Sequence, residues 1–442
     1  MKFNLKKENL FKLKKLRNFF KQKTTEFSLK ECFSNLNALI QHSGVNDINF
    51  VLENFSTDKI GSTIIKNLKN KIIAKSFFEK TNNYRKYTCC APYTSLNFDK
   101  SGNVTACCFS RSFSLGAFPK QTIKEIWFGA QLEQMRADLQ NYDFSKGCNT
   151  CLKHIVTGNF DNSLLKKFDY FKNYISKYPA VFEFELSNTC NFECIMCSGF
   201  FSSSIRKNRE KLPGIPQIYD KVFIDQLKEF IPHLKVCNFL GGEPFLIPIY
   251  YNIWEEIYKI NKDINIYATT NGSIFNDKVK EIIEKLPKFK LIFSIDSLKP
   301  DTYSFIRKNG NLDKLKECFY YFLGKNRVSG IAYCPMIQNI YELPDIIKLC
   351  EKYNLDLSIN TVQGPIGGRI KGIHENGDKE KTTHFTLVNT VSSSLNDLLP
   401  EVSLFTLSKE RKTEIVEKLS KFKFSNYYQK KLDGVINSLK IS

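Results

Sequence analysis

Strand-like and helix-like segments alternate between residues 179 and 363, and this alternation restricts the fold more than any other feature of the sequence. Short apolar runs with strand character cover residues 181–186, 236–240, 264–269, 290–296, 328–336 and 355–362. Amphipathic stretches of helical length lie between them, such as residues 249–260, 277–286, 312–322 and 343–353. Because parallel strands are joined by crossover helices, this order predicts an α/β fold with an open or closed barrel of parallel strands.

Chemically capable residues follow or close four successive predicted strands. In chain order they are Cys190, Cys194, Cys197, Gly241, Gly242, Glu243, Asn271, Ser294 and Asp296. In barrels of this class the reactive groups lie in the loops at the carboxyl ends of the strands. The sequence therefore predicts that these residues meet at one mouth.

The three cysteines form a Cys-x3-Cys-x2-Cys motif with no fourth cysteine or histidine close by in the sequence. A structural zinc site needs four protein ligands, whereas an iron–sulfur cubane held by three thiolates keeps one iron open. The count of ligands thus favours a cluster that binds a further, non-protein group.

The Gly241-Gly242-Glu243-Pro244 run fits the recognition of an amino group. Two glycines remove side chains where such a group must approach backbone carbonyls, and the Glu243 carboxylate can accept hydrogen bonds from an ammonium. Asn271 and Ser294, named above as candidate site residues, could equally have ordinary loop or helix-capping roles.

A second set of cysteines lies between residues 87 and 152, where short strands and turns prevail. A hairpin is predicted from residues 94–98 and 104–109, followed by a helix over 122–140 and a loop over 143–151. The set consists of Cys89, Cys90, Cys107, Cys108, Cys148 and Cys151. Adjacent cysteines in a strand point to opposite faces, so only one of Cys107 and Cys108 should reach a given cluster. Four thiolates of this spacing fit zinc as well as iron–sulfur.

The three-cysteine motif, followed about 45 residues later by Gly-Gly-Glu-Pro, resembles the radical S-adenosylmethionine (SAM) superfamily. The resemblance implies a partial (β/α)6 barrel in which Cys190, Cys194 and Cys197 hold a 4Fe-4S cluster. The amino and carboxyl groups of SAM would chelate its open iron. Gly241, Gly242, Glu243, Asn271, Ser294 and Asp296 would contact SAM. Met196 stands where relatives often carry an aromatic residue, and its apolar side chain can serve near the adenine.

The stretch from Cys90 to Cys151 resembles the auxiliary-cluster module called SPASM or, when shortened, twitch, which here precedes the barrel. The resemblance favours Cys90, Cys107, Cys148 and Cys151 as ligands of an auxiliary 4Fe-4S cluster over a zinc ion. Such an auxiliary cluster would accept or relay an electron from the substrate radical.

The two resemblances together imply a chemistry. A reduced cluster would cleave SAM to a 5'-deoxyadenosyl radical, which abstracts hydrogen from a peptide or from a sugar or other small molecule. The electron would come from an external donor such as flavodoxin or ferredoxin.

The first 86 residues are rich in lysine and arginine, within a chain of net charge +20. Leu10, Leu13, Leu16 and Phe20 share one face of a predicted basic helix. The charge suggests an acidic partner, such as nucleic acid, an anionic membrane surface or a phosphorylated substrate, but the lysine-rich composition of the whole chain is the stronger explanation. A helix that docks on its own protein would show the same pattern as one on a membrane. A non-enzymatic scaffold or electron carrier that binds nucleic acid through this segment is the alternative to an enzyme.

The predicted organisation has five parts. They are a basic helical extension (1–86), the auxiliary module (87–152), a helical linker (153–178), the barrel (179–363) and a glycine-rich loop with a helical tail (364–442). The loop over 364–383 is a lid over the mouth or a plain linker. Cys32, Cys237, Cys318, Cys334 and Cys350 are expected to be buried packing residues. No signal-like or bilayer-length apolar run is present, which favours the cytoplasm.

Overall fold

The computed structural model describes residues 70–71, 73–79, 87–156, 160, 163–360, 404 and 407–441. The chain falls into two compact units, Met1–Thr88 with Ala137–Lys166 and Cys89–Arg136 with Lys167–Ser442. Residues 70–71 and 73–79 of the predicted N-terminal extension are helical, and the rest of that extension lies outside the described residues. The predicted loop over 364–383 also lies outside them.

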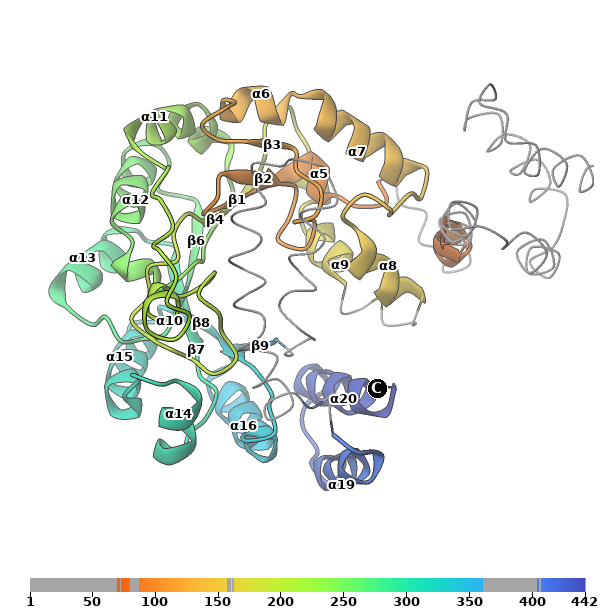
Figure 1. Ribbon diagram of the computed structural model, residues 1–442, viewed down its shortest axis with the longest axis vertical. Helices are drawn as coiled ribbons and strands as arrows, with labels where there is room; N and C mark the ends of the chain where they lie inside the picture. Colours follow the sequence, from red (N-terminus) through yellow and green to blue (C-terminus); the bar gives the residue numbers. More distant parts are fainter. Residues whose placement is uncertain are drawn as a thin grey trace, which may run out of the picture. The chain divides into compact units, whose positions relative to one another are not determined.

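A nine-stranded sheet organises the second unit (Figure 1), in the order β3-β2-β1-β4-β5-β6-β7-β8-β9. Its parallel strands after residue 179 are β4 (Val181–Glu185), β5 (Val236–Phe239), β6 (Asn265–Thr270), β7 (Phe289–Ser294), β8 (Val328–Tyr333) and β9 (Asp356–Ile359). All six predicted strands are present, and pairing between β9 and β3 is absent from the described ladder, so the sheet stays open. The predicted partial barrel is confirmed.

The hairpin of the predicted auxiliary module extends this same sheet. Strand β1 (Ser95–Asp99) pairs in parallel with β4, and β2 (Asn103–Thr105) and β3 (Gly116–Ala117) continue in antiparallel order. The Asp99 side chain accepts hydrogen bonds from the backbone N–H groups of Ser101 (2.8 Å) and Asn103 (3.1 Å), which fixes the turn. The hairpin is confirmed, but β2 is shorter than predicted.

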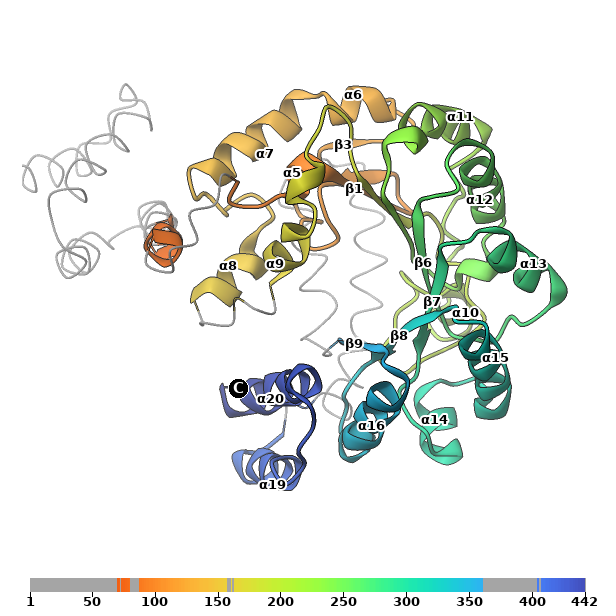
Figure 2. The same ribbon diagram turned by 180° about the vertical axis from the view of Figure 1, so that it is seen from behind.

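Crossover helices follow the strands along the outer side of the sheet, as Figures 1 and 2 show from opposite directions. In the second unit the helices after residue 179 are α10 (Ser203–Asn208), α11 (Lys221–Phe230), α12 (Pro248–Ile260), α13 (Asp277–Lys285), α14 (Pro300–Ile306), α15 (Leu312–Gly324), α16 (Leu343–Tyr353), α19 (Lys409–Leu419) and α20 (Asn426–Ile441). Short 3-10 helices are η2 (Lys172–Tyr174), η3 (Ile231–His233), η4 (Pro244–Leu246) and η5 (Ile340–Glu342). Side chains of Asp220, Asn276 and Asn311 cap α11, α13 and α15, as their residue types favour.

Two predictions between residues 122 and 151 are wrong in detail. The single helix expected over 122–140 is broken into α6 (Ile123–Trp127) and α7 (Ala130–Gln140), with Gly129 between them. A side chain at Gly129 would meet the Glu125 carbonyl oxygen at 2.6 Å, so glycine is required at the break. The loop expected over 143–151 ends early, because α8 (Asn149–Val156) already contains Cys151.

The first unit has a small aromatic core of its own. The Phe78 ring stacks on Tyr142 with ring centroids 5.8 Å apart, and Phe77 lies 5.1 Å from Phe160. Helix α9 (Leu164–Asp169) follows this region along the chain. Among the described residues, no helix combines the length and apolar character that crossing a membrane requires.

The C-terminal tail is helical, as predicted, and docks on the last crossover helix and strand. The Tyr428 hydroxyl of α20 lies 3.0 Å from the Cys350 carbonyl oxygen and 2.8 Å from that of Leu355. These two carbonyls belong to the end of α16 and to the turn that leads into β9. The tail is therefore anchored to the last helix and strand of the sheet.

Phe98 of β1 lets one test whether the predicted auxiliary module is part of the main core. Its fully buried ring lies 5.1 Å from Phe182, 5.7 Å from Phe184 and 5.3 Å from Phe223. We expect Phe98→Ala to lower the free energy of unfolding by about 3 to 5 kcal/mol, measured by urea denaturation. Phe305→Ala, at a ring that is 58% exposed on α14, should change it by less than about 0.5 kcal/mol. Equal effects of the two changes would contradict a shared core.

Candidate metal and cofactor site

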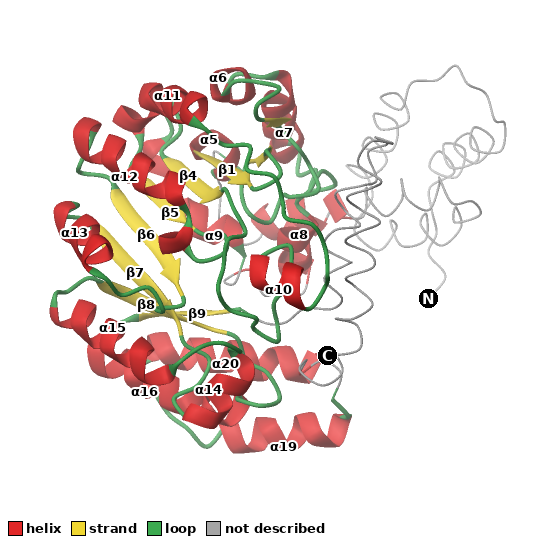
Figure 3. Cartoon of the chain, turned by 60° about the vertical axis from the view of Figure 1, so that its left-hand side comes forward, coloured by secondary structure: helices red, strands yellow, loops and turns green. Residues whose placement is uncertain are grey.

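The loop after β4 carries the three cysteines of the first motif and is held from two sides. On one side, the Cys190 N–H donates to Ser203 Oγ (3.1 Å), and Ser204 Oγ donates to the Cys190 carbonyl (2.8 Å). These serines begin α10, which lies among the loops at the ends of the strands in Figure 3. The Cys197 N–H donates to the Cys194 carbonyl (3.1 Å), and Arg209 donates to the carbonyl of Cys197.

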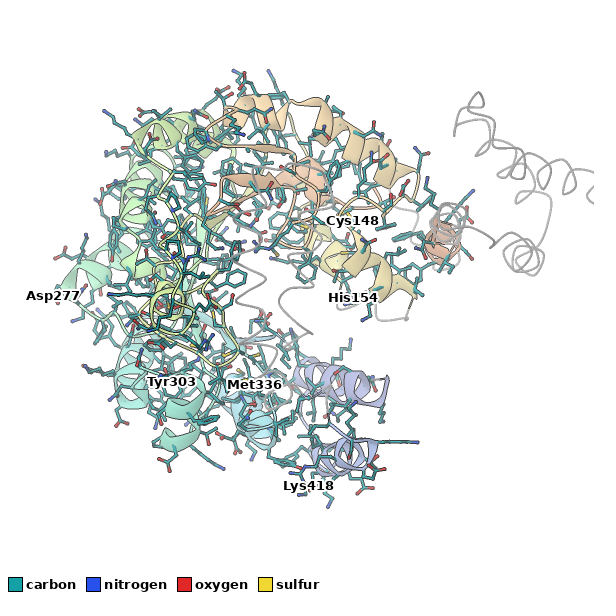
Figure 4. The ribbon with its side chains drawn as sticks, viewed as in Figure 1. Cys148, His154, Asp277, Tyr303, Met336 and Lys418 are labelled. Carbon is teal, nitrogen blue, oxygen red and sulfur yellow. The ribbon has the colours of Figure 1, made fainter. Side chains whose placement is uncertain are left out.

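On the other side, the last residue of α14 and the segment directly after it line the cysteine loop. The Glu193 N–H donates to the Lys308 carbonyl (3.0 Å), and the Ile195 N–H donates to the Ile306 carbonyl (2.9 Å). Met196 and Ile195 pack against the buried pair Ile306 and Met336, the latter labelled in Figure 4. Met196, which replaces the aromatic residue common in relatives, thus packs on an apolar cluster as an aromatic side chain could.

The thiols of this loop are close enough to influence one another. Burial raises the pKa of Cys190 to about 11, and Cys194 contributes to that rise. Burial, together with the neighbouring thiols of Cys194 and Cys190, raises the pKa of Cys197 above its ordinary value. Three soft donors in mutual electrostatic contact suit an iron–sulfur cluster, and binding it would release their protons.

Among the described residues, no group of three or more Cys, His, Asp or Glu side chains converges on a single-ion site. One zinc ion would require all its thiolates within about 2.3 Å of one centre. A four-iron cluster presents several metal atoms, so its ligands need not converge on one point.

Gly241 and Gly242 are needed for close approach between two loops of the protein itself. A Cβ at Gly241 would meet the Ser187 carbonyl oxygen at 2.6 Å, and one at Gly242 would meet that of Thr189 at 2.1 Å. Gly241 also has a φ of +111°, a backbone conformation that favours glycine. The contact is fixed by the Glu243 N–H, which donates to the Thr189 carbonyl (2.7 Å). The glycines thus seat this loop directly against the segment that leads into Cys190.

Glu243 is fully buried and joins its own loop to the end of β6. Its carboxylate accepts hydrogen bonds from Thr270 Oγ1 (2.8 Å) and from the N–H groups of Asn271 (2.7 Å) and Phe245 (3.3 Å). Burial raises its pKa to about 7 in spite of these bonds. A carboxylate has about four lone-pair positions, so one further donor can still be accepted.

Asn271 and Ser294 take different positions at the mouth. Asn271 Nδ2 lies 3.1 Å from Asn191 Oδ1 and 4.0 Å from Cys190 Sγ, so the structure brings Asn271 to the cysteine loop. Ser294 is partly buried at the end of β7.

Asp296 is fully buried and ion-paired with an arginine that the sequence reasoning missed. Its Oδ2 lies 2.6 Å from Arg307 Nη2, and its Oδ1 accepts from the Cys334 N–H at 2.7 Å. Arg307 Nη1 in turn lies 3.9 Å from Cys194 Sγ. Burial raises the pKa of Asp296 and the Arg307 guanidinium opposes that rise. The sequence signal for Arg307 was weak: it comes directly after the short helix α14, which follows Ser294 and Asp296 at the end of β7.

A second buried ionic group lies on the module side of the mouth. Lys100, from the turn after β1, is 1% exposed, and its Nζ lies 3.8 Å from Glu185 Oε2 and 3.7 Å from the centre of the Phe200 ring. Arg111 also pairs with Glu185 and donates through Nε to the Cys108 carbonyl (3.0 Å). Burial lowers the pKa of Lys100 to about 8. These residues connect the hairpin to β4 and to the turn after Cys197.

The cysteines of the predicted auxiliary site are divided between the two compact units. Cys90 and Cys107 belong to the unit of the sheet and are buried, whereas Cys148, labelled in Figure 4, and Cys151 belong to the other unit. Cys107 and Cys108 lie in a turn beyond β2, so the argument from opposite faces of a strand does not apply to them. Their assignment as a four-ligand set stays a prediction.

The remaining cysteines match the expectation in part. Cys237, Cys318 and Cys350 are buried, as predicted. Cys334 packs against the buried pair Ile306 and Met336, as a packing residue should, but it is only partly buried, so the expected full burial is wrong. Cys32 lies outside the described residues.

Two family models match the chain. The model of the radical SAM superfamily matches residues 184–350, and that of an iron–sulfur cluster-binding domain, SPASM, matches residues 89–152. The predicted resemblance to radical SAM proteins with an auxiliary module is confirmed. The cofactors of these domains are 4Fe-4S clusters and SAM.

Curated relatives include GTP 3',8-cyclases. That of Clostridium perfringens (strain SM101) is 30% identical over 197 residues, which are 42% of this chain and 57% of the relative. A probable GTP 3',8-cyclase of Methanocaldococcus jannaschii is 27% identical over 197 residues, 43% of this chain and 61% of the relative. The chain thus matches less than two thirds of the length of either.

Solved structures also resemble the chain. A polyhistidine-tagged anSMEcpe with bound AdoMet aligns with a TM-score of 0.35 and 18% identity, over 42% of this chain and 51% of that one. Streptococcus suis SuiB bound to S-adenosylmethionine aligns with a TM-score of 0.36 and 16% identity, over 63% of this chain and 60% of that one.

Replacing the buried Glu243 with glutamine should change how stability depends on pH. The pKa of this carboxyl is about 7 in the folded protein against 4.5 ordinarily, so the folded state binds more protons between these pH values. The free energy of unfolding of the cofactor-free protein should therefore fall by about 3 kcal/mol as pH rises from 4.5 to 7 because of this group.

In Glu243→Gln that contribution disappears, as urea denaturation at a series of pH values would show. Glu281→Gln, at an exposed position of α13, is the matched control and should keep the pH dependence of the parent protein. A parent-like slope in Glu243→Gln would contradict the assignment.

Proposed function

We propose that this chain, which belongs to the radical SAM superfamily and carries an iron–sulfur cluster-binding domain ahead of its radical SAM domain, is an enzyme that cleaves SAM reductively and abstracts hydrogen from an organic substrate. The observation that carries this proposal is the loop of Cys190, Cys194 and Cys197 at the carboxyl end of β4. It offers three soft ligands to a cluster and thereby leaves one iron for SAM.

The bound cluster and SAM together supply an electron and an organic radical strong enough to break a C–H bond. The protein must bind, orient and exclude water. In our proposal Cys190, Cys194 and Cys197 hold the cluster, and the backbone carbonyls at Gly241 and Gly242 and the free lone pair of Glu243 receive the amino group of SAM. Its remaining polar groups would meet Asn271, Ser294 and Asp296.

The geometry supports this division of roles through the way the loops are joined. The loop at Gly242 is hydrogen-bonded to the segment that leads into Cys190, and Asn271 lies 4.0 Å from the Cys190 sulfur. A molecule that chelates an iron held by Cys190 would thus lie next to the loops after β5 and β6. Asp296 is engaged with Arg307, so it would act on SAM as part of an ion pair.

We propose that Cys90, Cys107, Cys148 and Cys151 hold a second cluster. A zinc ion is the alternative, and metal analysis would distinguish the two. With four protein ligands, such a cluster has no open iron and would serve electron transfer from the substrate. The electron for SAM cleavage would come from an external flavodoxin or ferredoxin.

Deuterium transfer into 5'-deoxyadenosine identifies the substrate. GTP, which the names of the curated relatives suggest, is the first candidate to add, and peptides and sugars follow. Deuterium that moves from a labelled candidate into 5'-deoxyadenosine identifies the C–H bond that reacts.

Alanine in place of Cys190, Cys194 or Cys197 should abolish formation of 5'-deoxyadenosine from SAM and dithionite after anaerobic reconstitution, and should lower the iron content by about half. Cys318→Ala, which removes a buried thiol from α15, should keep both. If the reconstituted parent protein binds metal but does not cleave SAM, the enzymatic proposal is wrong and a scaffold or electron carrier remains.

The double change Cys148→Ala with Cys151→Ala should remove about half of the iron while the protein still cleaves SAM. The physical reason is that only the three-cysteine loop offers an open iron. Iron and zinc analysis by mass spectrometry, with the 5'-deoxyadenosine assay beside it, separates the possibilities. Loss of zinc at constant iron would assign zinc to this site, and loss of SAM cleavage would contradict separate roles.

A further inference from the structure

The segment from Ile306, the last residue of α14, to Asn309 forms a second wall of the cysteine loop. Its backbone accepts from the N–H groups of Glu193 and Ile195, and its side chains continue the contact. Asn309 Nδ2 lies 3.2 Å from Glu193 Oε1. Arg307 occupies the centre of this segment, between the two backbone hydrogen bonds, and its side chain extends to Cys194.

Arg307 is buried, with an exposed fraction of 8%, and is held in one place by several contacts. Its backbone N–H donates to the Tyr303 carbonyl (2.7 Å), its Nη2 pairs with Asp296 and its Nη1 lies 3.9 Å from Cys194 Sγ. The guanidinium of an arginine stays protonated in proteins. A permanent positive charge thus lies against one cluster ligand.

We propose that Arg307 is a positioning residue that donates a hydrogen bond to the Cys194 thiolate and raises the reduction potential of the cluster held there, while Asp296 limits the size of that effect. This inference rests on the proposed function, because it needs Cys194 as a cluster ligand. Reduction adds negative charge to the cluster, and hydrogen bonds to the ligand sulfurs together with nearby cations stabilise the reduced state.

The ion pair explains why the two residues should act with opposite sign. A guanidinium next to a thiolate favours the reduced cluster, whereas the carboxylate of Asp296 behind it disfavours added negative charge. Both groups are buried, so their charges are screened less than surface charges. A purely structural Arg307 would not give effects of opposite direction for the two members of the pair.

The test is a redox titration of the reconstituted protein without SAM, followed by the electron paramagnetic resonance signal of the reduced cluster. The double variant Cys148→Ala with Cys151→Ala serves as the background, so that a single cluster contributes. Arg307→Gln should shift the midpoint potential to a more negative value. A tenfold loss in the equilibrium constant for one-electron reduction equals about 59 mV.

Three further variants make the result decisive. Arg307→Lys, which keeps the charge but not the planar fork, should lie between the parent and Arg307→Gln. Asp296→Asn should shift the potential upward. Lys308→Gln removes a neighbouring cation that pairs with Glu193 at 3.7 Å and is 66% exposed, and should leave the potential unchanged.

An unchanged midpoint in Arg307→Gln, or an equal shift in Lys308→Gln, overturns the inference. If Arg307→Gln does not assemble a cluster, the directions found for Arg307→Lys and Asp296→Asn decide. A downward shift in Asp296→Asn, or none, would then overturn it. Failure of the parent protein to form a cluster or to cleave SAM is a separate outcome that overturns the proposed function itself.

Discussion

The mouth of this sheet is built around three neighbouring thiols, those of Cys190, Cys194 and Cys197, which would all have to become thiolates to hold the proposed cluster. Burial raises the pKa of each thiol, and the repulsion between anions raises that of Cys190 and Cys197 further. The residues around these thiols provide hydrogen-bond donors and cations. They include backbone N–H groups, Arg209 at the Cys197 carbonyl and Arg307 at Cys194. The surrounding loops therefore supply donors and cations to the negative charge that the proposed cluster would bring to these thiols.

Hydrogen bonds between the loops at the strand ends hold the cysteine loop in place. The loop after β4 accepts from the loop after β5, and Glu243 of that loop accepts from the end of β6. Asp296 after β7 accepts from the backbone after β8, at Cys334. The loops after β4, β5 and β6 are thus linked in series, so a change at Glu243 or Thr270 should affect the segment that leads into Cys190 even where it does not touch it.

Strands and capped helices could be predicted from the sequence because their signals are local. Apolar runs such as 181–186 and cap residues such as Asn276 determine their elements without help from distant residues. Glu243 and Arg307 show where this reasoning ends. The burial of Glu243, the loop-to-loop contact that requires Gly242, and the contact of Arg307 with Cys194 come from tertiary packing between segments far apart in the sequence. No periodicity or spacing encodes such contacts.

The predicted auxiliary module precedes the barrel in the chain and adds its strand β1 to the sheet next to β4. A parallel neighbour of β4 needs a crossover connection, and the helices between β3 and β4 supply it. In this register Ser95 lies opposite Val181, and the turn with Cys107 follows β2 on the side of the amino ends, since Ser95 Oγ donates to the Ala106 carbonyl.

The loop of Cys190 leaves the opposite, carboxyl end of β4. The two segments therefore lie at opposite ends of β4, whose five residues span about 16 Å. Along that strand the buried Glu183 and Glu185 share a face, and each is paired with cations. The strand between these two cysteine-bearing segments therefore carries buried carboxylates whose charges are balanced by cations.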